Sequence, residues 1–262
     1  MECNSGGAVM TIRVVIPSRY ASTRLPGKPL IDLLGLPMVV RVYQRVVEAL
    51  PECDCLVALD DRRISQVLDE YQIPWVMTRV DHESGTDRIA EVCRLAGWDQ
   101  SDIVINVQGD EPLIPKAMLG AFVDFIEAKT SFEMGTISAP VESLSTLQDS
   151  NVVKVVTSRE GKAIYFSRFG VPFCRDVAPE SITLEGYKRH IGVYAYRVDV
   201  LSLIAKAPPV DIEMREKLEQ LRALWLGVGI SVMDWFAQPP HGVDTAEDVK
   251  KVISVLKDQK ND

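Results

Sequence analysis

Short apolar runs alternate with amphipathic stretches through the first 107 residues. The apolar runs predict β-strands at 12–17, 56–59, 75–77 and 102–107. The last run is continuous rather than alternating, which is typical of a strand that is buried on both faces. Between the runs, apolar side chains recur every three or four residues and predict helices at 38–47, 64–71 and 89–96.

This alternation of strand and helix predicts an α/β fold with a mostly parallel central sheet and helices on both faces. Ligands of such sheets bind at the carboxyl ends of the strands. We therefore expect the loops that follow Pro17, Met77 and Val107 to converge on one site.

The pattern changes after about Glu133. Strands are predicted at 133–139, 152–157, 163–167 and 189–197, and we interpret 133–200 as a strand-rich insertion of smaller sheet pairs. A helix at 218–225, a strand at 230–235 and a final helix around 249–256 follow. Thr245 is the expected N-cap of the final helix, with Asp248 three positions later. Residues 1–10 are expected to be an N-terminal extension, and 11–262 a single domain.

Composition narrows the class of protein. The 262 residues carry 29 Lys and Arg against 37 Asp and Glu, a formal net charge of −8. This balance argues against a general binder of nucleic acid or anionic membranes, so a local cluster of cations must bind any anionic ligand. The longest stretch without Asp, Glu, Lys or Arg is Ala223–Met233, too short to span a bilayer. The N-terminus does not resemble a signal peptide, and five scattered cysteines fit a reducing, cytoplasmic environment.

The loop after the first strand contains a concentration of cations. Arg19, Arg24 and Lys28 lie within ten residues, and Gly27 allows the chain to approach a phosphate closely. The loop has neither the P-loop pattern nor the glycine pattern of dinucleotide-binding folds. We interpret it as an anion-binding loop; the alternative is an ordinary solvated basic loop.

Two carboxylates are candidate metal ligands. Asp110 follows Gly109 at the end of the buried strand, and Asp244 precedes the final helix. Mg²⁺ in proteins is commonly bound by one or two carboxylates together with phosphate oxygens. The alternatives are a turn residue at Asp110 and a helix cap at Asp244.

Two further segments carry polar side chains in patterns that indicate ligand binding. Ser84–Arg88 opens a helix, where backbone N–H groups and an arginine suit a nucleotide; a simple helix cap is the alternative. In the strand at 189–197, His190, Gly192, Tyr194 and Tyr196 share one face, as expected of a surface that binds a sugar. A half-exposed strand edge would show the same pattern.

The ordered set of motifs resembles the family of 3-deoxy-manno-octulosonate (Kdo) cytidylyltransferases, the CMP-Kdo synthetases. The resemblance extends from about Val14 to Leu256. It is carried by IPSRYASTRLPGKPL, MTRVDHESGTDR, VQGDEP, YFSR, RHIGVYAYR, EKLEQLRALW and GVDTAED, in that order.

The resemblance implies a nucleotide-diphospho-sugar transferase-like three-layer fold, a homodimer and transfer of CMP from CTP to Kdo with Mg²⁺, for bacterial lipopolysaccharide synthesis. It also implies roles for individual residues. The implied nucleotide-binding residues are Pro17, Arg19, Arg24, Lys28, Ser84, Gly85, Thr86, Arg88 and Asp110. The implied sugar-binding residues are Gln108, Arg168, His190, Tyr194, Glu219 and Gln220. The implied catalytic residues are Arg24, Lys28, Asp110 and Asp244, with the two aspartates holding Mg²⁺.

Within this set, Arg168 and His190 are expected to bind the carboxylate of the sugar. The 133–200 insertion is expected to serve both sugar binding and dimerisation. Three alternatives for the function stay open. They are a cytidylyltransferase for another acidic sugar (an amino-Kdo variant or a sialic acid), a nucleotidyltransferase for neutral sugar 1-phosphates, and a non-catalytic nucleotide-binding protein on the same scaffold.

Overall fold

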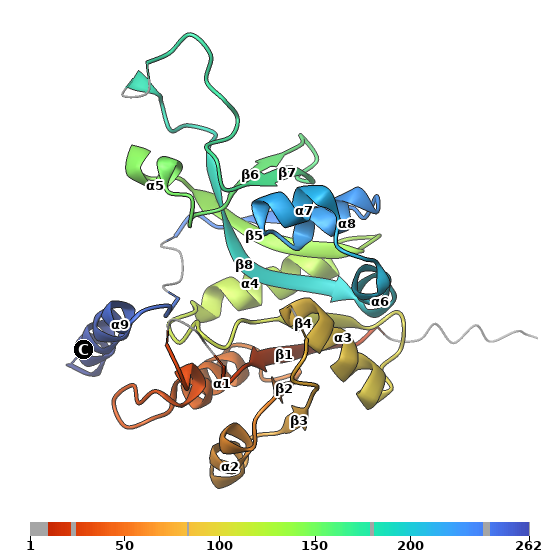
Figure 1. The fold of residues 1–262 in the computed structure, drawn as a ribbon, viewed down its shortest axis with the longest axis vertical. Helices are drawn as coiled ribbons and strands as arrows, with labels where there is room; N and C mark the ends of the chain where they lie inside the picture. The colour runs from red at the N-terminus through yellow and green to blue at the C-terminus, as the bar shows by residue number, and fades with distance from the viewer. Residues whose placement is uncertain (1–9, 22–24, 83, 179–180, 238–241, 262) are drawn as a thin grey trace, which may run out of the picture.

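The structure is a computed structural model that describes residues 10–21, 25–82, 84–178, 181–237 and 242–261 (Figure 1). Its strands are β1 (Ile12–Ser18), β2 (Asp54–Leu59), β3 (Trp75–Met77), β4 (Ile103–Asn106), β5 (Met134–Pro140), β6 (Lys154–Thr157), β7 (Ala163–Ser167), β8 (Lys188–Arg197) and β9 (Ile230–Asp234). Its helices are the 3₁₀ turn η1 (Lys28–Leu30), α1 (Met38–Ala49), α2 (Arg62–Glu70), α3 (Gly85–Ala96), α4 (Lys116–Glu127), α5 (Leu144–Gln148), α6 (Val198–Lys206), α7 (Asp211–Glu216), α8 (Gln220–Trp225) and α9 (Ala246–Asn261).

One sheet runs through both halves of the molecule. Its main path follows the order β3-β2-β1-β4-β8-β5-β9. β1, β2, β3 and β4 are mutually parallel, and β5 pairs with β9 in parallel. β8 is antiparallel to both of its neighbours on this path, β4 and β5. The mostly parallel sheet predicted from the alternating pattern is confirmed.

Helices cover both faces of the sheet because its strands are apolar on both sides. In β1, Val14 and Ile16 pack into one buried cluster, with side chains from α1, α2, α4 and α9. Val15, between them, points the other way into a second cluster with α3, α6 and α8. This period of two, repeated in neighbouring strands, produces the three-layer architecture in Figure 1.

The second half of the chain departs from the expected smaller sheet pairs. β5 and β8 pair with each other within the central sheet, so they extend it rather than form a separate one. β6 and β7 form a side hairpin, which is attached to the central sheet through β8. The cause lies in β8, whose ten residues are long enough to pair with β4, β5 and β6 at different points. Figure 1 shows the connection from β7 to β8 projecting beyond the sheet.

The final helix begins as its sequence predicts. The backbone N–H of Asp248 donates to the Thr245 hydroxyl at 3.3 Å, and the N–H of Thr245 donates to the Asp248 carboxylate at 3.0 Å. This reciprocal pair fixes the chain direction just after Asp244. Helices α4 and α6 were not predicted, although their apolar faces join the two buried clusters.

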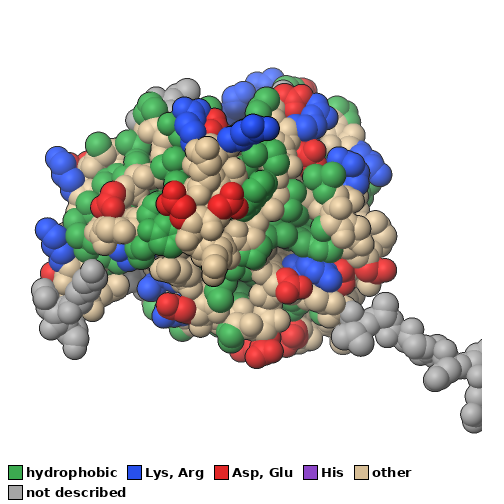
Figure 2. All heavy atoms as spheres, turned by 90° about the horizontal axis from the view of Figure 1, so that it is seen from below, with side chains coloured by type: hydrophobic (Ala, Val, Ile, Leu, Met, Phe, Trp, Pro, Cys, Tyr) green, Lys and Arg blue, Asp and Glu red, His purple; other side chains and the backbone are tan. Residues whose placement is uncertain are grey.

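The distribution of charged side chains on the surface agrees with the net negative charge of the chain. On the face in Figure 2, basic and acidic side chains are interspersed rather than gathered into one basic patch. Among the described residues, no helix combines the length and apolar character that crossing a membrane requires.

Candidate active site

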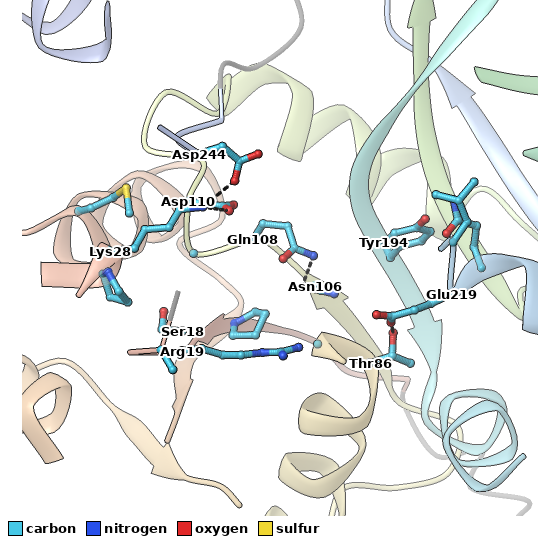
Figure 3. Close-up of a pocket in the computed structure, with 18 of the residues that line it drawn as sticks. Ser18, Arg19, Lys28, Thr86, Asn106, Gln108, Asp110, Tyr194, Glu219 and Asp244 are labelled. Atoms are coloured by element: carbon cyan, nitrogen blue, oxygen red, sulfur yellow. Dashed lines mark hydrogen bonds and ion pairs between the residues drawn. The ribbon is translucent and has the colours of Figure 1, made fainter. Parts of the chain in front are cut away.

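A cavity of about 550 Å³ opens at the carboxyl ends of β1 and β4. The start of α3, the C-terminal half of β8 and the segment from α7 to α8 complete its wall (Figure 3). Its volume is within the range of small-molecule sites. The residues that line it are Pro17, Ser18, Arg19, Ala21, Lys28, Pro29, Met38, Gly85, Thr86, Asn106, Gln108, Gly109, Asp110, Tyr194, Tyr196, Lys217, Leu218, Glu219, Gln220 and Asp244.

The two predicted metal-binding carboxylates meet at one cation. The Lys28 ammonium lies 2.6 Å from the Asp110 carboxylate and 3.1 Å from that of Asp244 (Figure 3). The backbone N–H of Val243 donates to the Asp110 carbonyl at 2.9 Å, which ties the two loops together. The expected convergence of residues 134 positions apart along the chain is confirmed.

Local backbone geometry places these groups. Gly27 has φ 67°, a left-handed conformation that suits glycine, and it opens the 3₁₀ turn that presents Lys28. Gly109 precedes Asp110 where β1 and the loop after β4 are closest. A Cβ atom at position 109 would lie only 2.7 Å from the Pro17 carbonyl oxygen and 2.7 Å from the Ser18 hydroxyl. Any larger residue would push Asp110 away from the loop of Lys28.

Burial and neighbouring charges set the ionisation of this cluster. Burial lowers the pKa of Lys28, but Asp110 and Asp244 outweigh that effect and leave it raised, so the lysine stays charged. Glu111 lies behind the pair. Burial, reinforced by the charge of Asp110, raises its pKa to about 8, so it is largely protonated at neutral pH. Glu111 therefore adds little negative charge to the cluster, in which Asp110 and Asp244 line the cavity.

The donor set fits a hard divalent cation. Two carboxylates that converge at the wall of an open cavity are typical of Mg²⁺ sites that leave other positions to phosphate oxygens and water. A complete protein cage is not present: the described residues contain no group of three or more His, Cys, Asp or Glu side chains placed to hold a metal. Arg24, the third predicted cation of the loop, lies outside the described residues.

The predicted nucleotide-binding residues divide into two groups. Pro17, Arg19, Gly85 and Thr86 line the cavity. Ser84 does not; it is the N-cap of α3, and its hydroxyl accepts the N–H of Asp87 at 3.0 Å.

Arg88 is fully buried, and its role differs from the predicted contact with nucleotide. Its guanidinium donates to Asp60 at 3.0 Å and to the Thr78 hydroxyl. The other Asp60 oxygen accepts the backbone N–H of Tyr20 at 3.0 Å. Arg88 therefore supports the cation-bearing loop from behind, because helix α3 points this side chain at the sheet and not at the cavity.

Four of the six predicted sugar-binding residues line the cavity: Gln108, Tyr194, Glu219 and Gln220. The Thr86 hydroxyl donates to Glu219 at 2.8 Å, which links the start of α3 to the opposite wall (Figure 3). Burial raises the pKa of Glu219, although the hydrogen bond from Thr86 acts in the opposite direction. The Tyr194 ring stacks near Tyr196, with 5.7 Å between centroids, and forms a flat aromatic wall.

Arg168 and His190 are placed differently from the prediction. Neither Arg168 nor His190 is among the described residues that line the cavity. The Arg168 guanidinium donates to three backbone carbonyls: Glu216 at 2.7 Å, Ser150 at 2.9 Å and Lys217 at 3.4 Å. His190 is desolvated, which lowers its pKa to about 3, so it is a neutral ring at neutral pH. A neutral imidazole does not supply the positive charge that was expected there.

Several cavity residues were missed by sequence reasoning. Ser18 and Asn106 are the last residues of β1 and β4, and the rule that ligands bind at strand ends was a signal for both. Lys217 was missed because it occupies an unremarkable position within EKLEQLRALW; only the folded chain brings it to the cavity.

Comparisons with known proteins identify the family of the chain. A family model described as Cytidylyltransferase matches residues 13–230. The chain is 52% identical to 3-deoxy-manno-octulosonate cytidylyltransferase 2 of Burkholderia ambifaria, over 96% of this chain and 95% of that protein. It is 44% identical to the corresponding enzyme of Thioalkalivibrio sulfidiphilus, over 95% of this chain and all of that one.

The chain belongs to the 3-deoxy-manno-octulosonate cytidylyltransferase family. A solved structure of CMP:2-keto-3-deoxy-manno-octonic acid synthetase, complexed with CTP, superposes with a TM-score of 0.86 at 36% identity, covering 95% of this chain and 99% of that one. Membership of this cytidylyltransferase family makes the chain an enzyme, a nucleotidyltransferase.

The fold is shared more widely than the family. A putative glucose-1-phosphate thymidylyltransferase from Bacillus anthracis superposes with a TM-score of 0.64 over 95% of this chain and 96% of that one, at 14% identity. At that identity the likeness concerns the fold alone. Membership of the Kdo cytidylyltransferase family therefore rests on the family model and on the relatives at 44–52% identity.

Proposed function

We propose that the protein transfers CMP from CTP to the anomeric hydroxyl of Kdo and releases pyrophosphate. The observation that carries the proposal is the meeting of Lys28, Asp110 and Asp244 at the mouth of a cavity that Arg19 also lines. The names of its close relatives supply the substrates, and the CTP complex of the similar solved structure supports the nucleotide.

The reaction needs charge neutralisation and alignment more than covalent chemistry. The sugar hydroxyl attacks the α-phosphorus, a new P–O bond forms, and the bond to pyrophosphate breaks in line with the attack. Lys28 and Arg19 supply positive charge to the triphosphate and to the departing pyrophosphate. Tyr194, Glu219 and Gln220 hold the sugar on the opposite wall, so that the two reactants are aligned within one site.

Asp110 and Asp244 are the residues that would hold Mg²⁺. When bound, the ion supplies charge stabilisation at the α-phosphate and orientation of the reactants. The Lys28 ammonium lies within hydrogen-bond distance of both carboxylates, which supports the assignment because a cation is already favoured between them.

The assembly and setting of the enzyme are part of the proposal. We propose a homodimer formed through the 133–200 region, which exposes large apolar side chains at Ile164, Phe169 and Phe173. Light scattering after gel filtration tests it, and a monomer would contradict it. We further propose a cytoplasmic enzyme whose product feeds lipopolysaccharide synthesis, in accord with the family and with the cysteine usage.

A pyrophosphate-release assay tests the activity. We expect pyrophosphate only when CTP, Mg²⁺ and Kdo are all present, with loss of signal when any one is omitted. Replacing Kdo by an amino-Kdo variant, a sialic acid or a neutral sugar 1-phosphate identifies the acceptor class. Faster turnover with one of these acceptors, or binding of CTP without any product, would contradict the proposal.

A further inference from the structure

Neither of the two residues predicted to bind the carboxylate of the acidic sugar is among the described residues that line the cavity. Kdo is an acid, and a buried carboxylate needs a cation or several hydrogen-bond donors. Arg168 is occupied by three carbonyls, and His190 is neutral. Lys28 is engaged with two aspartates on the nucleotide side. The sugar side of the cavity therefore calls for a different positive group.

We propose that Lys217 is that group: its ammonium binds the carboxylate of the acidic sugar and selects for acidic substrates. This inference rests on the proposed function, since it assigns one residue to the second substrate of the same reaction. Lys217 lines the cavity directly beside Leu218, Glu219 and Gln220, of which the last two are predicted sugar-binding residues.

The ammonium of Lys217 is available to a ligand. Within the described part of the chain, no hydrogen bond or ion pair engages it, and the residue is exposed at the cavity wall. Its backbone carbonyl, by contrast, accepts a hydrogen bond from Arg168. The main chain is thus held while the charged end stays unpaired, which is the arrangement expected of a binding residue.

The backbone at Lys217 supports the same assignment. Its φ is 54°, in the left-handed region that residues with a Cβ adopt rarely, and it is the residue at which helix α7 ends. Lysine has no side-chain amide to ease this conformation, whereas asparagine and glycine adopt it readily. A strained non-glycine residue on a cavity wall is typical of functional sites.

A network of hydrogen bonds maintains this conformation. The Glu216 carboxylate accepts the Ser167 hydroxyl at 2.7 Å and the N–H of Arg168 at 2.9 Å. The Arg168 guanidinium in turn donates hydrogen bonds to the backbone carbonyls of Glu216 and Lys217. The end of β7 and the end of α7 are thereby clamped together. Arg168, in this account, is a positioning residue for Lys217, which explains how it can matter for the sugar without lining the cavity.

The test compares Lys217→Asn and Lys217→Arg with the unaltered enzyme. Asparagine accepts the left-handed backbone and removes the charge, so the loop keeps its shape. We expect Lys217→Asn to raise KM for Kdo by about tenfold to hundredfold, the value of one charge-assisted hydrogen bond, while KM for CTP stays within about twofold. Lys217→Arg should restore most of the affinity for Kdo.

A matched control and a neutral ligand sharpen the test. Arg215→Asn removes an exposed cation two residues away and should leave both KM values unchanged. The carboxamide analogue of Kdo, used as a competitive inhibitor, should bind the unaltered enzyme and Lys217→Asn equally well. An unchanged KM for Kdo in Lys217→Asn, or a rise in KM for CTP alone, would overturn the assignment.

Failure of the inference and failure of the proposed function are distinguishable. If the unaltered enzyme does not convert CTP and Kdo, the proposed function is wrong. If it does convert them and Lys217→Asn retains the ordinary KM for Kdo, only the role of Lys217 is wrong.

Discussion

The two walls of the cavity differ in how their charged side chains are arranged. On the nucleotide wall, Lys28 forms ion pairs with both Asp110 and Asp244. Behind the sugar wall, Arg168 donates to backbone carbonyls and Glu216 accepts the backbone N–H of Arg168; on the wall itself, the Lys217 ammonium has no partner among the described residues. The first wall consists of loops at the ends of parallel strands; the second consists of an antiparallel strand and two short helices.

This difference shows in which part of the site the type of a residue is enough to identify a ligand contact. At the ends of parallel strands, the loops converge on the edge of the sheet where ligands bind, so a polar residue in such a loop is a good candidate for a ligand contact. In the irregular segment around α7, free carbonyls at the helix end compete for any nearby arginine. A cation in this segment can therefore have a structural role, as Arg168 does.

The largest effect is expected at Asp110. Asp110→Asn removes one of the two carboxylates that would hold Mg²⁺ and should lower kcat by about three orders of magnitude, the upper range for one electrostatic group. The fold should survive, because Asp110 is partly exposed and lies in a loop. Pyrophosphate release measures the rate, and circular dichroism controls for folding. A near-normal rate with Mg²⁺ would refute the metal assignment.

The next test concerns Arg88. It asks whether this residue supports the loop of the nucleotide wall from behind or contacts the nucleotide directly. Arg88→Met leaves Asp60 as an unpaired buried charge and should cost about 3–5 kcal/mol of unfolding free energy. Urea denaturation measures it, with the exposed Arg215→Met as control. Should stability be unchanged while CTP binding is lost, Arg88 would be a direct nucleotide contact after all.

Lys28→Met should raise the barrier to CMP transfer by about 2–4 kcal/mol, since it removes one charge that stabilises the leaving phosphates. The effect should appear in kcat at saturating CTP. Lys28→Arg keeps the positive charge, so its kcat should fall less than that of Lys28→Met. A change in kcat within about twofold for Lys28→Met would support the alternative of a solvated basic loop.

The smallest effect concerns His190 and depends on pH. Desolvation lowers its pKa from 6.5 to about 3, so the folded state resists a proton that the unfolded chain accepts. The resulting stability is present above the unfolded pKa and is lost as pH falls towards 3.

His190→Gln removes this dependence and should be compared with the unaltered protein by urea denaturation at about pH 7 and about pH 5. The unfolding free energy of the unaltered protein should fall relative to the variant by at most about 1.4 kcal/mol per pH unit. Parallel pH profiles for the two proteins would show that His190 takes up its proton equally in the folded and unfolded states, and would contradict the lowered pKa on which its exclusion as a carboxylate ligand rests.

Sequence reasoning located most of the nucleotide wall because its signals are local. The β1, β3 and β7 runs, the cap at Thr245 and the strand-end position of Asp110 each follow from residues close together in the chain. The parallel topology brings the loops that follow strands together, which is why Lys28 and Asp110 were expected at one site. The pairing of Asp110 with Asp244 came from the resemblance to the family, and the structure brings both carboxylates to Lys28.

The tertiary structure alone decided the other wall. Whether Arg168 faces a ligand or a carbonyl, whether Arg88 reaches the cavity or Asp60, and whether His190 carries a charge all depend on burial and on partners far away in the chain. Residue type determines what a side chain is able to bind. The free energy of desolvation, set by packing between distant segments, determines which of those partners it takes.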